Sequence, residues 1–111
     1  MEDKTILIVD DEIDFGFLMK EFFLQKGCKV FLATTIAAGL GLLQQEKPDV
    51  LLMDNQLPDG FGWSKTDFIL QNYPNIQLIL ISAFEVPKTS SSLFSIMQKP
   101  FLKDELLKMF S

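Results

Sequence analysis

The chain has 111 residues, of which 48% are hydrophobic and 23% are charged, and its formal net charge at pH 7 is -5. This length and balance predict a single globular domain over residues 1–111. One cysteine and no histidine exclude an internal disulfide, a Cys/His metal site and a Ser-His-Asp triad. The acidic charge argues against direct binding to nucleic acid or to an anionic membrane. The apolar runs are far shorter than a membrane span and the N-terminus is not signal-like, so we expect a cytoplasmic protein.

Short apolar runs alternate with amphipathic segments along the whole chain. We predict strands over residues 6–9, 29–33, 49–53, 76–81 and 94–98. We predict helices over residues 12–26, over residues 35–46, from an N-cap at Ser64 to about Tyr73, and over residues 102–110. Between the fourth and fifth strands, residues 85–92 are polar and rich in serine, which leaves at most a short helix there.

This alternation predicts an α/β fold with a doubly wound, five-stranded parallel sheet in the order 2-1-3-4-5 and helices on both faces. In such sheets ligands bind beyond the carboxyl ends of the strands, where the strand order reverses. The reversal lies between the first and third strands. Asp10 and Asp11 follow the first strand and Asp54 follows the third, so we expect these acids to meet at one edge.

Three clustered carboxylates need a neutralising partner, because two like charges about 4 Å apart repel by about 4 kcal/mol at an effective dielectric of about 20. Shared protons, a basic side chain or a hard cation would serve, and Mg²⁺ suits a site made only of oxygen ligands. Lys99 closes the fifth strand and Ser82 closes the fourth, so an ammonium and a hydroxyl reach the same edge. This set is typical of a carboxylate that acts as a nucleophile toward phosphorus.

Each of these residues also has a purely structural interpretation. Asp10 and Asp11 are suited to cap the first helix, and either residue can do this besides binding a metal. Asp54 is also suited to a turn, and Ser82 to bonding a backbone group at a strand end. We expect Glu12 to be a solvated first-turn acid rather than a metal ligand.

Four fragments together resemble the receiver domain of two-component response regulators, of the single-domain chemotaxis type. They are ILIVDDEI at residues 6–13, LLMDNQLPD at residues 51–59, ILISAF at residues 79–84 and QKPFL at residues 98–102. The resemblance extends along nearly all of the chain. It implies the flavodoxin-like form of the predicted sheet.

The resemblance implies that Asp54 accepts a phosphoryl group from a sensor histidine kinase or a phosphotransfer protein. Mg²⁺ would be held directly by Asp11, through water by Asp10, by Asp54, and by the backbone carbonyl of Gln56. Lys99 would bind a phosphoryl oxygen, and Ser82 would move toward the phosphoryl group once it forms. The Lys99–Pro100 peptide bond would be cis.

The chain also departs from the family pattern. The interval from Ser82 to Lys99 is shorter than usual, which predicts a shortened or irregular fourth helix and an altered output surface. Ile96 stands three positions before the lysine, where the family usually has an aromatic residue. Phe84, two positions after the switch hydroxyl, is bulky enough to hinder water, so we predict a long-lived phosphorylated state.

We therefore expect a signalling switch rather than a metabolic enzyme, which acts on an unknown downstream protein by direct contact and does not itself touch nucleic acid. The alternative is a receiver-like binding module that works without phosphorylation. A receiver portion of a hybrid kinase or of a longer regulator is also open. A phosphatase with an aspartate nucleophile fits less well, since we would expect more chain for a substrate cap.

Overall fold

The computed structural model describes residues 2–84, 92–101 and 103–110. Its strands are β1 (Thr5–Val9), β2 (Lys29–Ala33), β3 (Val50–Asp54), β4 (Gln56–Leu57), β5 (Gly60–Phe61), β6 (Gln77–Ser82) and β7 (Phe94–Gln98). Its helices are α1 (Ile13–Gln25), α2 (Ile36–Glu46), the short 3-10 helix η1 (Gly62–Lys65), α3 (Thr66–Asn72) and α4 (Lys103–Lys108).

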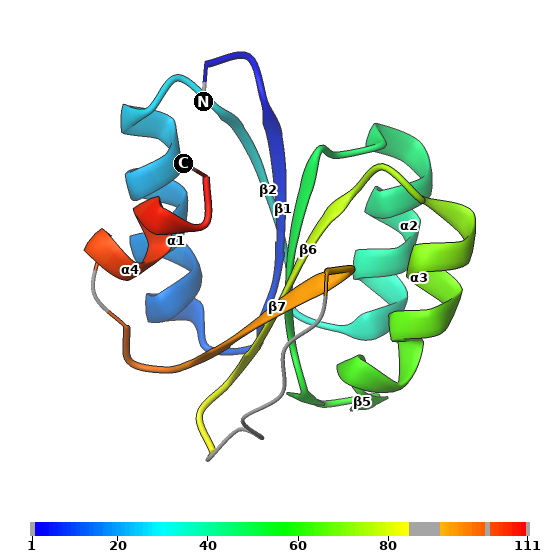
Figure 1. Cartoon of the computed structure of the whole chain (residues 1–111). Helices are drawn as coiled ribbons and strands as arrows, with labels where there is room; N and C mark the ends of the chain where they lie inside the picture. Colours follow the sequence, from blue (N-terminus) through cyan, green and yellow to red (C-terminus); the bar gives the residue numbers. More distant parts are fainter. Residues whose placement is uncertain (1, 85–91, 102, 111) are drawn as a thin grey trace.

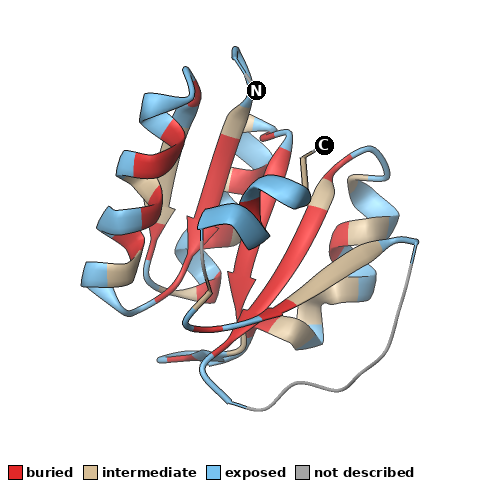
Figure 2. Ribbon diagram, turned by 60° about the vertical axis from the view of Figure 1, so that its left-hand side comes forward, coloured by how far each residue is buried: buried red, intermediate tan, exposed pale blue. Residues whose placement is uncertain are grey.

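Five strands form one parallel sheet in the order β2-β1-β3-β6-β7, which confirms the predicted order 2-1-3-4-5 (Figure 1). The register places Ile6 opposite Val50 and Asp54 opposite Ile81. The three inner strands are buried almost throughout, because helices cover both faces (Figure 2). The first and third strands are neighbours, so the acids at their carboxyl ends come together.

The two faces of the sheet carry separate apolar cores. Helices α1 and α4 cover one face, where Phe23 and Leu106 pack on β1, β3 and β6. Helices α2 and α3 cover the other, where Leu43 and Ile69 pack on the same strands. Side chains alternate between the faces along each strand, and each fully buried aliphatic side chain contributes about 1.5–3 kcal/mol. These cores hold the strand ends at fixed positions, which the site requires.

Helix α2 lies unusually close to the sheet at Gly39. A Cβ atom at this position would come within 2.7 Å of Val9 Cγ2, a separation that real side chains do not adopt. The two glycines of this helix, which by propensity alone destabilise it, therefore differ in role: Gly39 permits close packing, whereas a Cβ at Gly41 would meet open space.

The local structure around α3 differs from the prediction in two respects. Ser64 does not cap α3, because its hydroxyl donates to the carbonyl of Phe61 and the helix begins after Lys65 without a side-chain cap. The antiparallel pair β4–β5 and the 3-10 helix were not predicted. The shortened or irregular helix predicted between Ser82 and Lys99, which is not α4, falls mainly on residues 85–91, outside the described residues.

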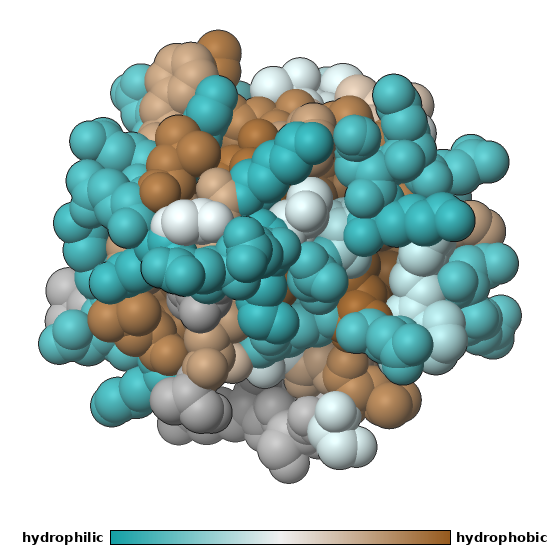
Figure 3. All heavy atoms as spheres, turned by 90° about the horizontal axis from the view of Figure 1, so that it is seen from above, coloured by the Kyte–Doolittle hydropathy of each residue, from teal (hydrophilic) through white to brown (hydrophobic). Residues whose placement is uncertain are grey.

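The end of the molecule opposite the acids carries mostly hydrophilic groups with apolar patches among them (Figure 3). Among the described residues, no helix has the length and apolar character needed to cross a membrane.

Candidate functional site

Four strand ends converge on one edge of the sheet and deliver the predicted site residues there. Asp10 follows β1, Asp54 is the last residue of β3, and Ser82 is the last residue of β6. Lys99 follows β7, and its N–H donates to the carbonyl of Ser82 at 2.7 Å. The Lys99–Pro100 peptide bond is cis, as the family resemblance implied.

The predicted acid cluster forms. One carboxylate oxygen from each of Asp10, Asp11 and Asp54 lies within 4.8 Å of the others. Asp10 and Asp54 are buried, with exposed fractions of 4% and 6%, whereas Asp11 is exposed. A hard divalent cation prefers such an all-oxygen set, and the exposed carboxylate leaves room for bound waters. The donor chemistry therefore fits Mg²⁺.

Lys99 brings a buried ammonium to this cluster and offsets part of its negative charge. Its Nζ donates to Asp10 Oδ2 and to Glu12 Oε1, both at 2.8 Å, and lies 4.0 Å from Asp54 Oδ1. The ring of Phe15 lies below the ammonium, 4.6 Å from Nζ to the ring centroid. The side chain of Glu12 is 58% exposed, as expected for a solvated first-turn acid, but its pairing with Lys99 was not predicted. No local signal indicates this pairing, because the lysine lies 87 residues further along the chain.

The N-cap residue of α1 is Glu12, which has no side-chain cap, so the predicted capping by Asp10 is wrong; the carboxylate of Asp10 instead makes two other hydrogen bonds. Its Oδ1 accepts the N–H of Glu12 at 2.9 Å, just before α1 begins, while its Oδ2 holds Lys99. This double use fixes the orientation of the carboxylate.

The surroundings of Asp54 disfavour its charge. Burial first, and then the negative charge of Asp10, raise the pKa of Asp54 from 3.8 to about 6, with a smaller contribution from Asp11. Lys99 and a hydrogen bond from the backbone N–H of Asn55 act in the opposite direction. A carboxylate in this position gains from any cation that binds beside it.

The surroundings of Lys99, in contrast, favour its charged form. Burial by itself would lower the pKa of Lys99, but the hydrogen bonds to Asp10 and Glu12 and the charges of Asp10 and Asp54 outweigh burial. The net effect raises the pKa of Lys99, so the side chain stays an ammonium at neutral pH.

A small hollow of about 310 Å³ opens beside Asp54. Its lining consists of Asp11, Glu12, Asp54, Gln56, Ser82, Ala83 and Phe84. Ser82 Oγ accepts the N–H of Phe84 at 3.1 Å, at the edge of the hollow. Gln56 and Phe84 thus stand where the sequence placed them, at the rim. A group of the size of a phosphate fits in this space.

The loop after Asp54 turns back sharply at Gly62. The N–H of Gly62 donates to the carbonyl of Asn55 at 2.7 Å, and a Cβ at Gly62 would overlap the carbonyl of Asp54. Asp59, in the same loop, points away from the acid cluster. Its carboxylate accepts the N–H groups of Ile36 and Ala37, at 2.8 and 3.0 Å, and so caps α2 together with Thr35.

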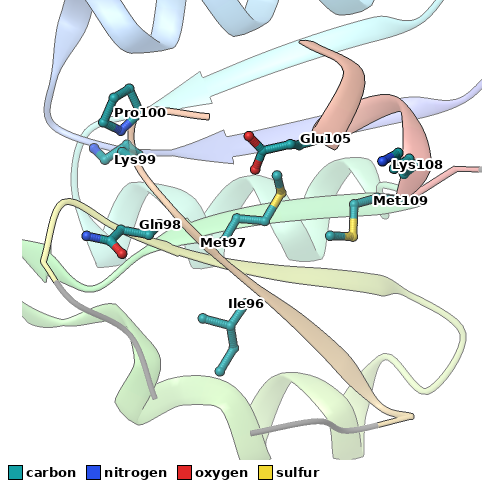
Figure 4. Close-up of a pocket in the computed structure, with 8 residues that line it drawn as sticks. All are labelled: Ile96, Met97, Gln98, Lys99, Pro100, Glu105, Lys108 and Met109. Atoms are coloured by element: carbon teal, nitrogen blue, oxygen red, sulfur yellow. The ribbon is translucent and has the colours of Figure 1, made fainter. Parts of the chain in front are cut away.

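A second hollow, of about 560 Å³, lies beside β7 and α4 (Figure 4). Met97 and Ile96 point to opposite sides of the strand, and Lys99 and Pro100 follow at its end. Ile96 packs with the core on the α2 and α3 face, at the position where the family usually carries an aromatic ring.

Comparison with known proteins places the chain in a family. The response regulator receiver domain matches residues 6–111. The chain is similar to sporulation initiation phosphotransferase F of Bacillus subtilis (strain 168), with 30% identity over 96% of this chain and 90% of that protein. It is 29% identical to the DNA-binding transcriptional regulator NtrC of Proteus hauseri over 96% of this chain, but spans only 24% of that protein.

Solved structures share the fold. A CheY-like response regulator receiver domain protein from Methanospirillum hungatei JF-1 matches with a TM-score of 0.86 and 24% identity, over 98% of this chain and 91% of that one. The BeF3-activated DrrB receiver domain matches with a TM-score of 0.82 and 23% identity, over 97% and 94%. The chain therefore belongs to the response regulator receiver domain family of two-component signal transduction.

Proposed function

We propose that residues 1–111 form a phosphoacceptor switch in which Asp54 receives a phosphoryl group from a histidine of a sensor kinase or a phosphotransfer protein. One observation carries this proposal. A buried carboxylate with a raised pKa stands 4.0 Å from a buried lysine, within a cluster of three acids, at the floor of an open hollow. A module that only bound partners would gain nothing from this arrangement, since clustered buried acids destabilise a fold.

The transfer follows from this chemistry. A carboxylate oxygen of Asp54 attacks phosphorus, and the bond from phosphorus to the donor's imidazole nitrogen breaks with its electron pair left on nitrogen. The product on this chain is an acyl phosphate, which water later cleaves to aspartate and inorganic phosphate. The chain thus takes part in phosphoryl transfer without turning over a metabolite.

The acids would hold Mg²⁺ through Asp10, Asp11 and Asp54, with the backbone carbonyl of Gln56 completing the protein ligands. When bound, the ion offsets the repulsion among the carboxylates and screens the charge on the phosphoryl oxygens. The shared burial of Asp10 and Asp54 supports this assignment, because two buried like charges need more than one lysine to balance them.

Lys99 and Ser82 would hold the phosphoryl oxygens. The ammonium already lies near Asp54, and Glu12, its more exposed partner, can give up its hydrogen bond to an incoming oxygen at little cost. The Ser82 hydroxyl accepts from Phe84, and a hydroxyl that accepts can also donate its own hydrogen. These two donors would bind the oxygens from different sides of the hollow.

The donor protein would dock against the start of α1. Ile13 and Phe17 stand one helical turn apart on the same side of α1 and are 61% and 59% exposed. Ile13 directly follows Asp11 and Glu12, which line the hollow. An apolar helix face on the donor would cover the side chains of Ile13 and Phe17 while its histidine reaches Asp54.

The test is phosphoryl uptake from radiolabelled acetyl phosphate with Mg²⁺, and without it in excess EDTA. Wild type should take up label only with Mg²⁺, and Asp54→Asn should take up none. Asp59→Asn is the matched control, because it changes an acid of the same loop that lies outside the cluster, and it should take up label like wild type. Uptake that persists in Asp54→Asn would contradict the assignment of Asp54 as the acceptor, and no uptake by wild type would favour the phosphorylation-independent module.

A further inference from the structure

The indole of Trp63 joins the two strands that carry Asp54 and Ser82. Its Nε1 donates to the carbonyl of Met53 at 3.1 Å and to the carbonyl of Ile81 at 3.2 Å. Met53 immediately precedes Asp54, and Ile81 immediately precedes Ser82. One N–H group thus bridges the residue before the phosphoacceptor and the residue before the hydroxyl.

This bridge stands where the ladder between β3 and β6 stops. The N–H of Gln77 donates to the carbonyl of Asp49, which sets the phase of the ladder, and Asp54 pairs with Ile81 at its last position. If the ladder continued in this phase, the N–H of Asn55 would donate to the carbonyl of Ile81. The N–H of Asn55 instead donates to the carboxylate of Asp54, and the indole N–H of Trp63 donates to the carbonyl of Ile81.

The loop around Trp63 is itself anchored to β3. The carbonyl of Asn55 accepts from Gly62, and Asn55 Oδ1 accepts the backbone N–H of Trp63 at 3.2 Å. The indole packs against the apolar core on the α2 and α3 face. Backbone bonds, a side-chain bond and packing therefore all hold the ring in this orientation.

We propose that Trp63 is a positioning residue, which sets the separation between Asp54 and Ser82 through its indole N–H. This rests on the proposed function, in which both side chains contact the same phosphoryl group. A ladder that simply ended at Asp54 would let the end of β6 move away from β3. With the indole in place, the Ser82 hydroxyl stays within reach of oxygens bound to Asp54.

The experiment compares Trp63→Phe with wild type, because phenylalanine keeps an aromatic ring and removes the N–H. The measurement is the rate of label uptake from acetyl phosphate with Mg²⁺, in a cycle with Ser82→Ala. Losing the bridging N–H, with its hydrogen bonds to both carbonyls, should slow uptake by about 3- to 10-fold. In the Ser82→Ala background the same change should alter the rate by less than about 2-fold, since the group that Trp63 positions is gone.

Ser64→Ala is the matched control, because it removes a hydrogen bond of the same loop that touches neither strand, and it should take up label at the wild-type rate. Equal slowing by Trp63→Phe in both backgrounds indicates a purely structural role and overturns the inference, as does a wild-type rate in Trp63→Phe. No uptake by wild type would instead contradict the proposed function.

A second measurement is used if urea titration of Trp63→Phe shows no cooperative unfolding, which means that the variant is not folded. Trp63 is the sole tryptophan, so emission excited at the indole band reports on the surroundings of this ring. Beryllofluoride with Mg²⁺, a mimic of the acyl phosphate, should change the emission of wild type and have a much smaller effect in Ser82→Ala. The same change in both proteins, or no change in wild type that takes up label, overturns the inference.

Discussion

Replacing Asp54 by asparagine should stabilise the protein at neutral pH when divalent ions are absent. Burial first, and then the charge of Asp10, raise the pKa of Asp54 from 3.8 to about 6. Because the folded pKa lies above the unfolded value, the ionised side chain destabilises the fold at high pH, and this cost disappears as the pH falls. Each pKa unit corresponds to about 1.4 kcal/mol, so the cost at neutral pH is about 3 kcal/mol. Asparagine never carries the charge.

The assay is urea unfolding in EDTA at several values between pH 4 and pH 8, followed by Trp63 emission. The free energy of unfolding of Asp54→Asn should exceed that of wild type by about 2–3 kcal/mol above pH 6, and the gap should shrink toward zero near pH 4. Adding Mg²⁺ should stabilise wild type and close part of the gap, because the ion binds the ionised cluster. A gap that does not change with pH, or a variant less stable than wild type at neutral pH, would refute this reasoning.

Four further predictions concern single substitutions of Lys99, Asp59, Phe84 and Phe17. Lys99→Met should lower the free energy of unfolding in EDTA by about 2–4 kcal/mol, because it leaves the buried carboxylate of Asp10 unpaired; an unchanged urea midpoint would contradict the pairing. The pKa of Asp59 is lowered because its carboxylate accepts backbone N–H groups of α2, so it stabilises the fold above its unfolded pKa and this contribution is lost as the pH falls through its folded pKa. Asp59→Ala should therefore weaken amide protection at the start of α2 at pH 7 but hardly at pH 2. An equal loss of protection at both pH values would count against this capping role. Phe84→Ala should lose its label faster than wild type in a chase experiment, because the exposed ring at the rim hinders water; an unchanged half-life would end that hypothesis. Phe17→Ser should slow transfer from a phosphohistidine donor and leave uptake from acetyl phosphate unchanged, and equal slowing with both donors would argue against docking at α1.

The sheet and the position of the acids could be predicted because they follow from local patterns. Buried parallel strands are continuous apolar runs, and four of the five runs here end at an acid, a hydroxyl or a lysine, so the strand order brings Asp10, Asp54 and Lys99 together. The exposure of Glu12 follows from its place at a helix start, but its pairing with Lys99 does not. The pairing depends on a lysine 87 residues later in the chain.

The loop after Asp54 makes contacts with distant residues that a local sequence pattern does not predict. Asp59 caps a helix that begins 23 residues earlier, and Trp63 bonds carbonyls on two strands, so neither partner lies within reach of a local pattern. A sequence window assigns an aspartate near Pro58 and Gly60 to a turn, and an aromatic residue to the core. Both assignments are partly right, since the residues do lie in a turn and against the core, but their polar atoms serve distant backbone groups.

Locating the phosphoryl group within the chain tests the central claim most directly. The protein is incubated with acetyl phosphate and Mg²⁺ and reduced with borohydride, which converts an aspartyl phosphate to homoserine, and its peptides are then sequenced by mass spectrometry. Reduction at position 54 alone is the predicted result, with Asp10, Asp11 and Asp59 unchanged. Reduction at another carboxylate, or at none although Mg²⁺ is bound, would contradict the account of Asp54 as the nucleophile.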